Sequence, residues 1–237
     1  MRRPRDNGIA LVIALVLTAF FAVVGLGLVF TVSVDRLGAM NHEDQARALY
    51  AADAALALAA SELARTGDFD AVLEGRAVSA YTDGESAGLR VLSGGGAVDL
   101  VALTGELSCG RSAGCTDAQV AVSTAARPWG ANNPRWRPYV YLPLADVVGP
   151  AAGSLYIAVW IGDDATETDG EPAVDGGGDA GAGRGVLRAH AEAFGRLGAR
   201  HAVEAELARV CVEPGAGAGC LPGIRVQSWR QVADRLP

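Results

Sequence analysis

The chain has 237 residues, half of them hydrophobic, and a formal net charge of −7. This acidity argues against a nucleic-acid partner, because general binding to a phosphate backbone depends on basic side chains. Once an apolar run near the N-terminus is set aside, about 200 residues remain. That is enough for one folded domain with room for a minor second lobe.

The N-terminus combines a short basic leader with a long apolar run. Residues 1–8 read MRRPRDNG, and residues 9–34 contain no charged side chain. As a helix this run would extend roughly 39 Å at about 1.5 Å per residue, enough to cross a hydrocarbon core of about 30 Å. It is longer than the apolar region of an ordinary secretory signal, about 7–15 residues. We therefore expect a transmembrane helix at 9–34, with the leader in the cytoplasm and the remainder exported.

Residues 35–66 are predicted to continue this helix as an amphipathic segment. The segment contains no proline and is rich in Ala, Leu, Glu and Arg, which favour helices. Gly67 follows as a C-terminal cap signal, so we predict one helix from about Ile9 to Thr66. Apolar positions three or four residues apart form a stripe that should pack on a globular body. They are Leu49, Ala52, Leu56, Ala60 and Leu63.

Residues 67–237 are predicted to form an exported, β-rich head. Residues 155–161 alternate Leu, Ile and Val with Tyr, Ala and Trp, a period of two that predicts a strand. Residues 119–123 and 139–142 are shorter strand candidates. Residues 186–194 and 199–211 flank the turn sequence GRLG and predict a hairpin, although their Ala, Glu, Arg and Leu content leaves a helical alternative open.

Residues 162–185 are an acidic, glycine-rich stretch with seven carboxylates and one arginine. The stretch has little to bury, so we expect a surface loop. Two interpretations remain: a solvated loop without a ligand, or a calcium site, since Ca²⁺ takes about six to eight oxygen ligands. The EF-hand pattern is absent. A calcium site would use Asp163, Asp164, Asp169 and Asp175.

The four cysteines fall into two close pairs, Cys109 with Cys115 and Cys211 with Cys220. An even number in an exported domain favours disulfides, although free buried thiols remain an alternative. Four cysteines allow three pairings, of which we favour the two local loops. Zinc is disfavoured, because the spacings are not those of a ligand knuckle and no histidine lies beside either pair.

No catalytic pattern stands out. The sequence lacks a nucleophile triad context, a phosphate-binding loop and an HExxH motif, and His42, His190 and His201 are isolated. Residues 127–141 interleave arginines with tryptophan and tyrosine, which could stack on nucleotide bases or sugars. The alternative is a proline-rich loop whose aromatic side chains anchor on the sheet. We expect a protein that is not an enzyme.

The leader ending in Gly8, followed at once by an uncharged helix from Ile9, resembles the class III signal peptides of type IV pilins and type II secretion pseudopilins. More narrowly, NGIALVIALVLT and NHEDQARALYAADAAL resemble the PilX-like minor pilins. In those proteins a G-x-A-L-V-x-A-L start is followed by an Ala-rich A-A-E/D-A-A-L segment. Residues 8–15 and 51–56 correspond to these two motifs.

This resemblance implies an α+β, pilin-like fold, with the long N-terminal helix packed on an antiparallel β-sheet head. It also implies cleavage by prepilin peptidase between Gly8 and Ile9, with an uncleaved signal anchor as the alternative. Ile13 would be the fifth mature residue, where major pilins carry a glutamate. A carboxylate within the membrane is energetically costly unless it is paired. In lacking this glutamate, the chain resembles tip or minor pilin subunits.

The sequence therefore predicts a structural protein without a required cofactor: a minor pilin-like subunit that primes or caps a type IV pilus. Its partners would be prepilin peptidase and other major and minor pilins, bound through the N-terminal helix. It would span the inner membrane once, with its head in the periplasm or at the cell surface, and then enter the pilus. The alternatives are a minor pseudopilin of type II secretion and a membrane-anchored binding or adhesion module outside any filament.

Overall fold

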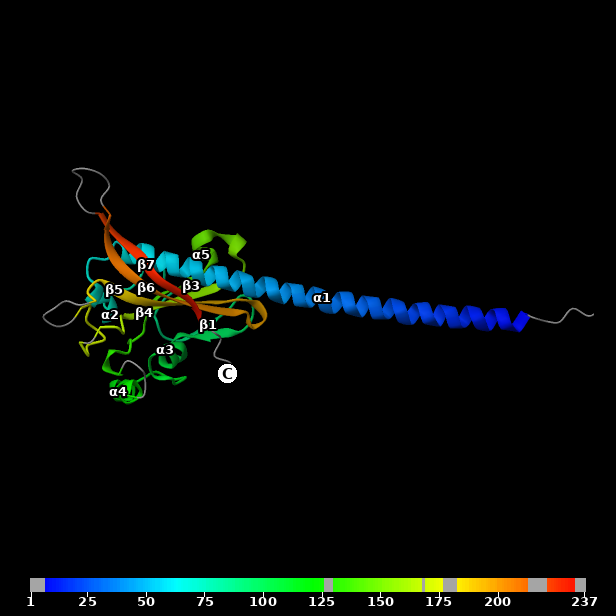
Figure 1. Ribbon diagram of the computed structural model, residues 1–237, viewed down its shortest axis with the longest axis horizontal. Coiled ribbons are helices and arrows are strands. Elements are labelled where there is room, and N and C mark those ends of the chain that lie inside the picture. The colour runs from blue at the N-terminus through cyan, green and yellow to red at the C-terminus, as the bar shows by residue number, and fades with distance from the viewer. Residues whose placement is uncertain (1–6, 126–129, 168, 177–182, 213–220, 233–237) are drawn as a thin grey trace, which may run out of the picture. The chain divides into compact units, whose positions relative to one another are not determined.

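The computed structural model describes residues 7–125, 130–167, 169–176, 183–212 and 221–232. The chain divides into two compact units, Met1–Glu43 and Asp44–Pro237, each described by itself below. One helix, α1 (Asn7–Leu63), runs through the boundary between them (Figure 1). The long N-terminal helix is thus confirmed, and its observed ends lie within three residues of the predicted ones.

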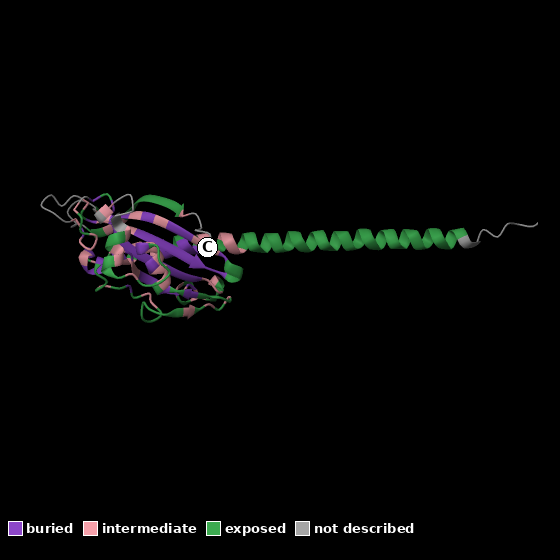
Figure 2. Ribbon diagram, turned by 90° about the horizontal axis from the view of Figure 1, so that it is seen from below, coloured by how far each residue is buried: buried purple, intermediate pink, exposed green. Residues whose placement is uncertain are grey.

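In the first unit, the described residues belong entirely to α1. All side chains from Ile9 to Glu43 are exposed to the surroundings (Figure 2). No proline interrupts this part of the helix, and Gly25, Gly27 and Gly38 remain helical. The helix therefore persists here through local hydrogen bonding, without a packed core of its own.

The second unit is built on a five-stranded antiparallel sheet in the order β3-β4-β5-β6-β7, the chain order of its strands. A two-stranded sheet, β1 with β2, accompanies it. The long helix and the antiparallel sheet match the expected α+β, pilin-like architecture. The strands are β1 (Leu89–Val91), β2 (Ala97–Asp99), β3 (Arg137–Pro143), β4 (Tyr156–Asp163), β5 (Val186–Phe194), β6 (Arg200–Val212) and β7 (Leu221–Val232).

Strand β4 is buried along its whole length, on both faces of the sheet. Ile157, Val159 and Ile161 lie in the core cluster that includes α1, and Ala158 and Trp160 lie in the cluster on the opposite face. The alternation predicted for 155–161 therefore separates two packed faces, with no solvent-facing side.

The C-terminal half of α1 covers the first of these faces. Its buried positions include four that are fully buried alanines, and their small side chains allow the helix to lie close to the sheet. The predicted positions Leu49 and Ala60 are only partly buried, so the buried face is turned slightly from the predicted stripe. Its members are Ala48, Ala51, Ala52, Ala55, Leu56, Ala59 and Leu63.

Helix α3 (Leu100–Cys109) packs against the second face of the sheet. Asp99 caps its N-terminus, because its Oδ1 accepts the amides of Val101 and Ala102 at 2.9 and 3.1 Å. Trp160 Nε1 donates to Thr104 Oγ1 at 2.8 Å, which ties the helix to the buried strand.

The predicted hairpin is confirmed. Strands β5 and β6 pair antiparallel from Val186 with Ala208 to Phe194 with Arg200. The residues that favoured helix form strands here because they alternate: Leu187, Ala189, Ala191 and Ala193 face the core cluster that contains α1, which satisfies a period of two. The strand predicted at 139–142 is also present, within β3.

The strand predicted at 119–123 is wrong: these residues belong to helix α4 (Asp117–Ala125). A reciprocal capping box starts the helix. The amide of Gln119 donates to Thr116 Oγ1 at 3.3 Å, and the amide of Thr116 donates to Gln119 Oε1 at 3.0 Å. The short helices α2 (Phe69–Leu73) and α5 (Ala145–Val148) were not predicted either.

Candidate functional site

The first candidate site is the apolar surface of α1 between Ile9 and Val34. Its side chains are exposed, with Leu26 at 71% and Phe30 at 72%. A helix that is hydrophobic all round belongs in a membrane or among other apolar helices. By length and composition, α1 qualifies as a membrane-spanning helix.

Three hydroxyl groups interrupt this apolar surface, and each is bonded within the helix. Thr18 Oγ1 donates to the carbonyl three residues earlier at 2.9 Å. Thr31 and Ser33 donate to carbonyls four residues earlier at 3.0 and 2.7 Å. Because lipid offers no water to satisfy polar groups, this internal bonding suits the hydroxyls to an apolar environment.

The predicted cleavage point lies in the first turn of α1. The helix begins at Asn7, so Gly8 and Ile9 are both helical, and residues 1–6 lie outside the described part of the chain. Ile13 is exposed and apolar, and the first acidic side chain after Gly8 is Asp35. The apolar surface therefore carries no carboxylate.

The second candidate site is a carboxylate cluster formed by Asp163, Glu167 and Asp169. One carboxylate oxygen of each lies within 4.8 Å of those of the other two. Asp163 is the last residue of β4, so the sheet fixes its position, and Glu167 and Asp169 follow in the next turn. Asp163 is only 2% exposed and Glu167 only 4%. This part of the acidic stretch is therefore buried, which the expectation of a surface loop did not anticipate.

The cluster contains three buried oxygens without a hydrogen-bond partner. The Gly176 amide donates to Glu167 Oε2 at 3.1 Å, and the Glu171 amide donates to Asp169 Oδ1 at 2.9 Å. The other oxygens of these two side chains, Glu167 Oε1 and Asp169 Oδ2, accept no hydrogen bond from the described residues, and neither does Asp163 Oδ1. Buried polar atoms are normally satisfied, so three together call for a ligand or a proton.

Burial and mutual repulsion raise the pKa values of the cluster. The pKa of Asp163 rises to about 8, chiefly because burial disfavours its charged form and then because Glu167 lies nearby. The pKa of Glu167 rises to about 7, again mainly through burial, although the Gly176 amide opposes the shift. Near neutral pH, the cluster on its own is therefore partly protonated.

Two of the four predicted calcium ligands, Asp164 and Asp175, are not among the three side chains of the cluster. Both oxygens of Asp164 accept hydrogen bonds from Thr166, from the amide at 3.0 Å and from the hydroxyl at 2.5 Å. Asp175 Oδ1 accepts the Gly185 amide at 2.6 Å. The structure thus brings together Asp163 and Asp169 of the predicted set and adds Glu167.

The inclusion of Glu167 in place of Asp164 has a simple geometric reason. Successive residues at the end of a strand point to opposite sides, so Asp163 and Asp164 do not converge on one point. The chain then turns, with the Glu167 amide donating to the Asp164 carbonyl at 3.2 Å, and this turn brings Glu167 back beside Asp163. The alternation was visible in the sequence, but the turn was not.

Cys109 and Cys115 form a disulfide at the C-terminal end of α3. No described cysteine is a free thiol. Cys220 lies outside the described residues, so its pairing with Cys211 stays a prediction.

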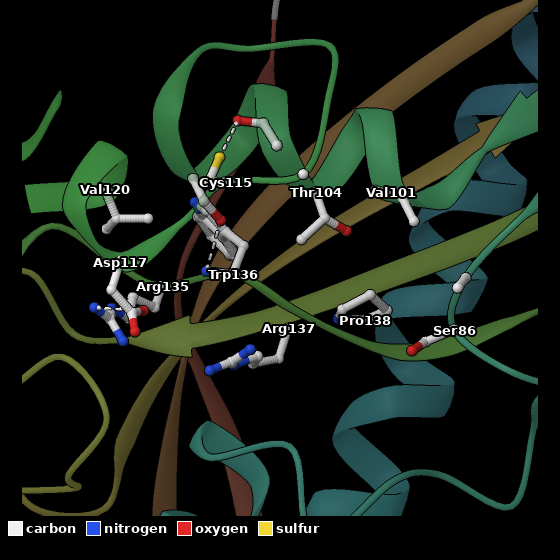
Figure 3. A pocket seen from close by; sticks show the side chains of 14 residues that line it. Ser86, Val101, Thr104, Cys115, Asp117, Val120, Arg135, Trp136, Arg137 and Pro138 are labelled. Carbon is white, nitrogen blue, oxygen red and sulfur yellow. Dashed lines mark hydrogen bonds and ion pairs between the residues drawn. The ribbon is translucent and has the colours of Figure 1, made fainter.

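A pocket of about 290 Å³ lies between α3 and the start of β3, and Arg135 and Trp136 line it (Figure 3). Arg135 pairs with Asp117 at 3.3 Å. Trp136 and Tyr139 are only 6% and 3% exposed. The described aromatic side chains of the arginine-rich segment therefore anchor on the sheet, and residues 126–129 lie outside the described part of the chain.

His190, to which the sequence assigned no role, lies at the centre of a buried charged group. Its Nε2 contacts Glu192 Oε1 at 2.9 Å and its Nδ1 contacts Glu204 Oε1 at 3.1 Å. Burial alone would lower the pKa of His190, but the hydrogen bonds to the two carboxylates outweigh it and raise that pKa. Arg200 pairs with Glu192, so the charges are balanced within the sheet. We interpret this group as structural.

These features define a class of protein: one in which a helix long and apolar enough to span a membrane continues into an amphipathic half packed on an antiparallel sheet. Within that class, the family model PilX N-terminal matches residues 7–57. The match covers the apolar surface and most of the amphipathic half of α1, and it confirms the resemblance to PilX-like type IV pilins drawn from 8–15 and 51–56. No curated protein and no solved structure matches the chain.

Proposed function

We propose that the protein is a minor pilin that takes part in type IV pilus assembly as a priming or tip subunit. One observation carries the proposal: the PilX N-terminal family matches residues 7–57, the part of the chain that bears the exposed apolar surface. Pilins are structural proteins, and the role proposed is assembly, not catalysis.

In this proposal, prepilin peptidase cuts between Gly8 and Ile9. Helix α1 then remains in the inner membrane until the filament is assembled. The apolar surface then leaves lipid and packs among the helices of other pilins. Since both surroundings are apolar, this exchange depends on close packing more than on the hydrophobic effect. Gly25 and Gly27 have open space around their α-carbons, which favours close approach of another helix.

Ile13 supports a minor role over a bulk one. A carboxylate at this position would need a partner in the membrane, because an unpaired charge there is costly. With isoleucine, the subunit needs no charged partner from a neighbouring subunit. It can therefore occupy a position where one neighbour is missing, as at the start or tip of a filament. In lacking a glutamate at this position, the chain also resembles the large pseudopilin of type II secretion. A role as a subunit of a secretion pseudopilus is therefore the second candidate function.

Replacing Gly8 tests the proposal. A bulky side chain in Gly8→Leu should block processing and keep the protein out of sheared filaments, whereas Gly8→Ala should retain both. The measurements are the size of the membrane-extracted protein and its presence in the filament fraction. Normal filament incorporation of an unprocessed Gly8→Leu protein would overturn the proposal. Recovery of the wild-type protein only in pseudopili of a secretion system would favour the second candidate.

A further inference from the structure

The carboxylate cluster has three oxygens that the described part of the chain leaves without a hydrogen-bond partner. Asp163, Glu167 and Asp169 bring three carboxyl groups within reach of one point. Two of the three side chains are almost completely buried. Each contributes one oxygen that accepts no hydrogen bond from the described residues. A buried carboxylate without a partner costs several kcal/mol unless a cation or a proton compensates it.

We propose that Asp163, Glu167 and Asp169 form a calcium-binding site, with Asp163 Oδ1, Glu167 Oε1 and Asp169 Oδ2 as ligand atoms. The three ligand residues lie outside α1, and this proposal goes beyond the proposed function in pilus formation. Its consequence is local: the ion would fix the start of the segment between β4 and β5.

The hydrogen bonds within the turn orient the side chains for this role. Backbone amides of Gly176 and Glu171 hold the second oxygens of Glu167 and Asp169. These bonds restrain each carboxylate, and the other oxygen accepts no hydrogen bond from the described residues. Asp163 needs no such support, because it is the terminal residue of a fully buried strand.

The backbone also closes tightly over Glu167. A side chain at Gly183 would place its Cβ 2.1 Å from Glu167 Oε1, and Gly183 has a φ of +82°. Only glycine fits such a contact in the left-handed region. The chain that leads into β5 therefore lies directly against a proposed ligand atom, so the cluster joins both ends of the acidic stretch.

The chemistry of the ligands favours calcium among the common cations. Ca²⁺ binds oxygens at about 2.3–2.6 Å, so two ligands of one ion lie at most about 5 Å apart, which the 4.8 Å limit of the cluster satisfies. The cluster offers only carboxylate oxygens, whereas zinc and copper prefer imidazole or sulfur. Mg²⁺ keeps several waters of its own, which suits side chains as buried as Asp163 and Glu167 poorly.

Shared protons are the competing explanation. The pKa values of Asp163 and Glu167, raised to about 8 and 7, allow the cluster to be partly protonated near neutral pH. A protonated cluster would bind no ion, and its stability would not respond to calcium. The two explanations therefore predict different results in one experiment.

The experiment uses the full chain in detergent at pH 7.5, with calcium titrated by calorimetry and thermal unfolding followed in CaCl₂, MgCl₂ or EDTA. We expect a dissociation constant of about 0.1 mM or tighter for Ca²⁺. At calcium about 100-fold above this constant, Tm should rise by about 5–10 °C. MgCl₂ at the same concentration should give much less. An absence of calcium heat with an unchanged Tm, or an equal response to Mg²⁺, would overturn the proposal.

Two variants place the binding at the cluster. Glu167→Gln keeps the shape of the side chain and should weaken calcium binding at least tenfold. Glu171→Gln, which removes an equal charge from an exposed position of the same segment, should bind as the wild type does. Unchanged binding by Glu167→Gln would show that calcium, if bound, is held elsewhere.

A second pair tests the same site without changing charge. Gly183→Ala should displace Glu167 and weaken calcium binding. Gly198→Ala is its control, since Gly198 has a similar φ of +78° with open space around it. Both variants place an alanine in the left-handed region, so both should lose some stability for that reason. Only a loss of calcium affinity that is specific to Gly183→Ala therefore supports the site. Equal affinity in the two variants would count against Glu167 as a ligand.

Discussion

At the scale of single residues, the head contains two buried charged groups of opposite character. The His190 group is balanced: its imidazole lies between Glu192 and Glu204, and arginines pair with both carboxylates. In the carboxylate cluster, three oxygens accept no hydrogen bond from the residues that the structure describes. The His190 group lies on β5 and β6, whereas the carboxylate cluster lies at the end of β4 and in the segment that follows. The first group therefore supports folding directly, whereas the second requires an ion or protons.

The His190 group gives a pH dependence whose sign follows from the pKa shifts. The pKa of His190 is raised, so its contribution to stability is full below about 6.5 and is lost as the pH rises through its folded value. Hydrogen bonds from His190 and Arg230 outweigh burial and lower the pKa of Glu204 to about 2. Its contribution is present above about 4.3 and is lost as the pH falls toward 2. The group should contribute most between about pH 4.5 and 6.5.

His190→Gln should lower the free energy of unfolding by about 3–5 kcal/mol at pH 6, because two buried carboxylates lose their shared partner. The difference from wild type should shrink once the pH exceeds the folded pKa of His190. Chemical denaturation of the full chain in detergent at several pH values measures both effects. Titration of Asp163 and Glu167 is common to both proteins, so it does not contribute to the difference.

His201→Gln, at a half-buried position on β6, is the matched control and should change stability by less than about 1 kcal/mol at every pH. A loss in His190→Gln that stays constant from pH 6 to pH 10 would contradict a charged histidine at the centre of the group.

At the scale of elements, the head depends on β4 and on the alanine-rich face of α1. Strand β4 is buried on both sides, so α1 must cover one face closely. Ala48, Ala52, Ala55 and Ala59 are fully buried and provide that close contact. Larger side chains at these positions would push the helix away from the sheet.

Ala55→Leu should therefore destabilise the head by about 1–3 kcal/mol, because the added volume has no space to occupy. Ala54→Leu adds the same side chain at the neighbouring exposed position and should change stability by less than about 0.5 kcal/mol. Denaturant midpoints of the two variants give the comparison. Equal midpoints would indicate that α1 does not pack on the sheet as described.

The elements with strong periodicity could be predicted from the sequence. Helix α1, strand β4 and the β5–β6 hairpin each have a regular apolar pattern. Helix α4 was missed because Val120 and Val122 alternate like a strand, whereas the capping box at Thr116 decides the structure. Local hydrogen bonding outweighed the apolar pattern there.

The candidate site could be predicted only in part, for a different reason. The acidic composition of 162–185 pointed to calcium, but composition does not show which carboxylates converge. That depends on the end of β4 and on the turn that returns Glu167 to Asp163. The partners of His190 lie on the same strand and on β6, and the pairing register that brings Glu204 beside it is a property of the folded sheet.

At the scale of the whole molecule, the two units differ in exposure: α1 is exposed from Ile9 to Glu43, and its later residues pack on the sheet. The buried face of residues 44–63 is already occupied by the sheet of the same chain, so the proposed assembly through α1 would use residues 9–43. The apolar surface between Ile9 and Val34 is exposed there, and charged side chains follow from Asp35 onward. The proposed calcium binding in the head and the proposed processing at Gly8 should accordingly be independent of each other.

The most direct test of a pilin role is the mass of the N-terminal peptide of the protein recovered from sheared filaments. The mature chain is expected to begin at Ile9, with residues 1–8 absent. An intact Met1, or a chain cut beyond Val34 that has lost the apolar surface, would contradict it.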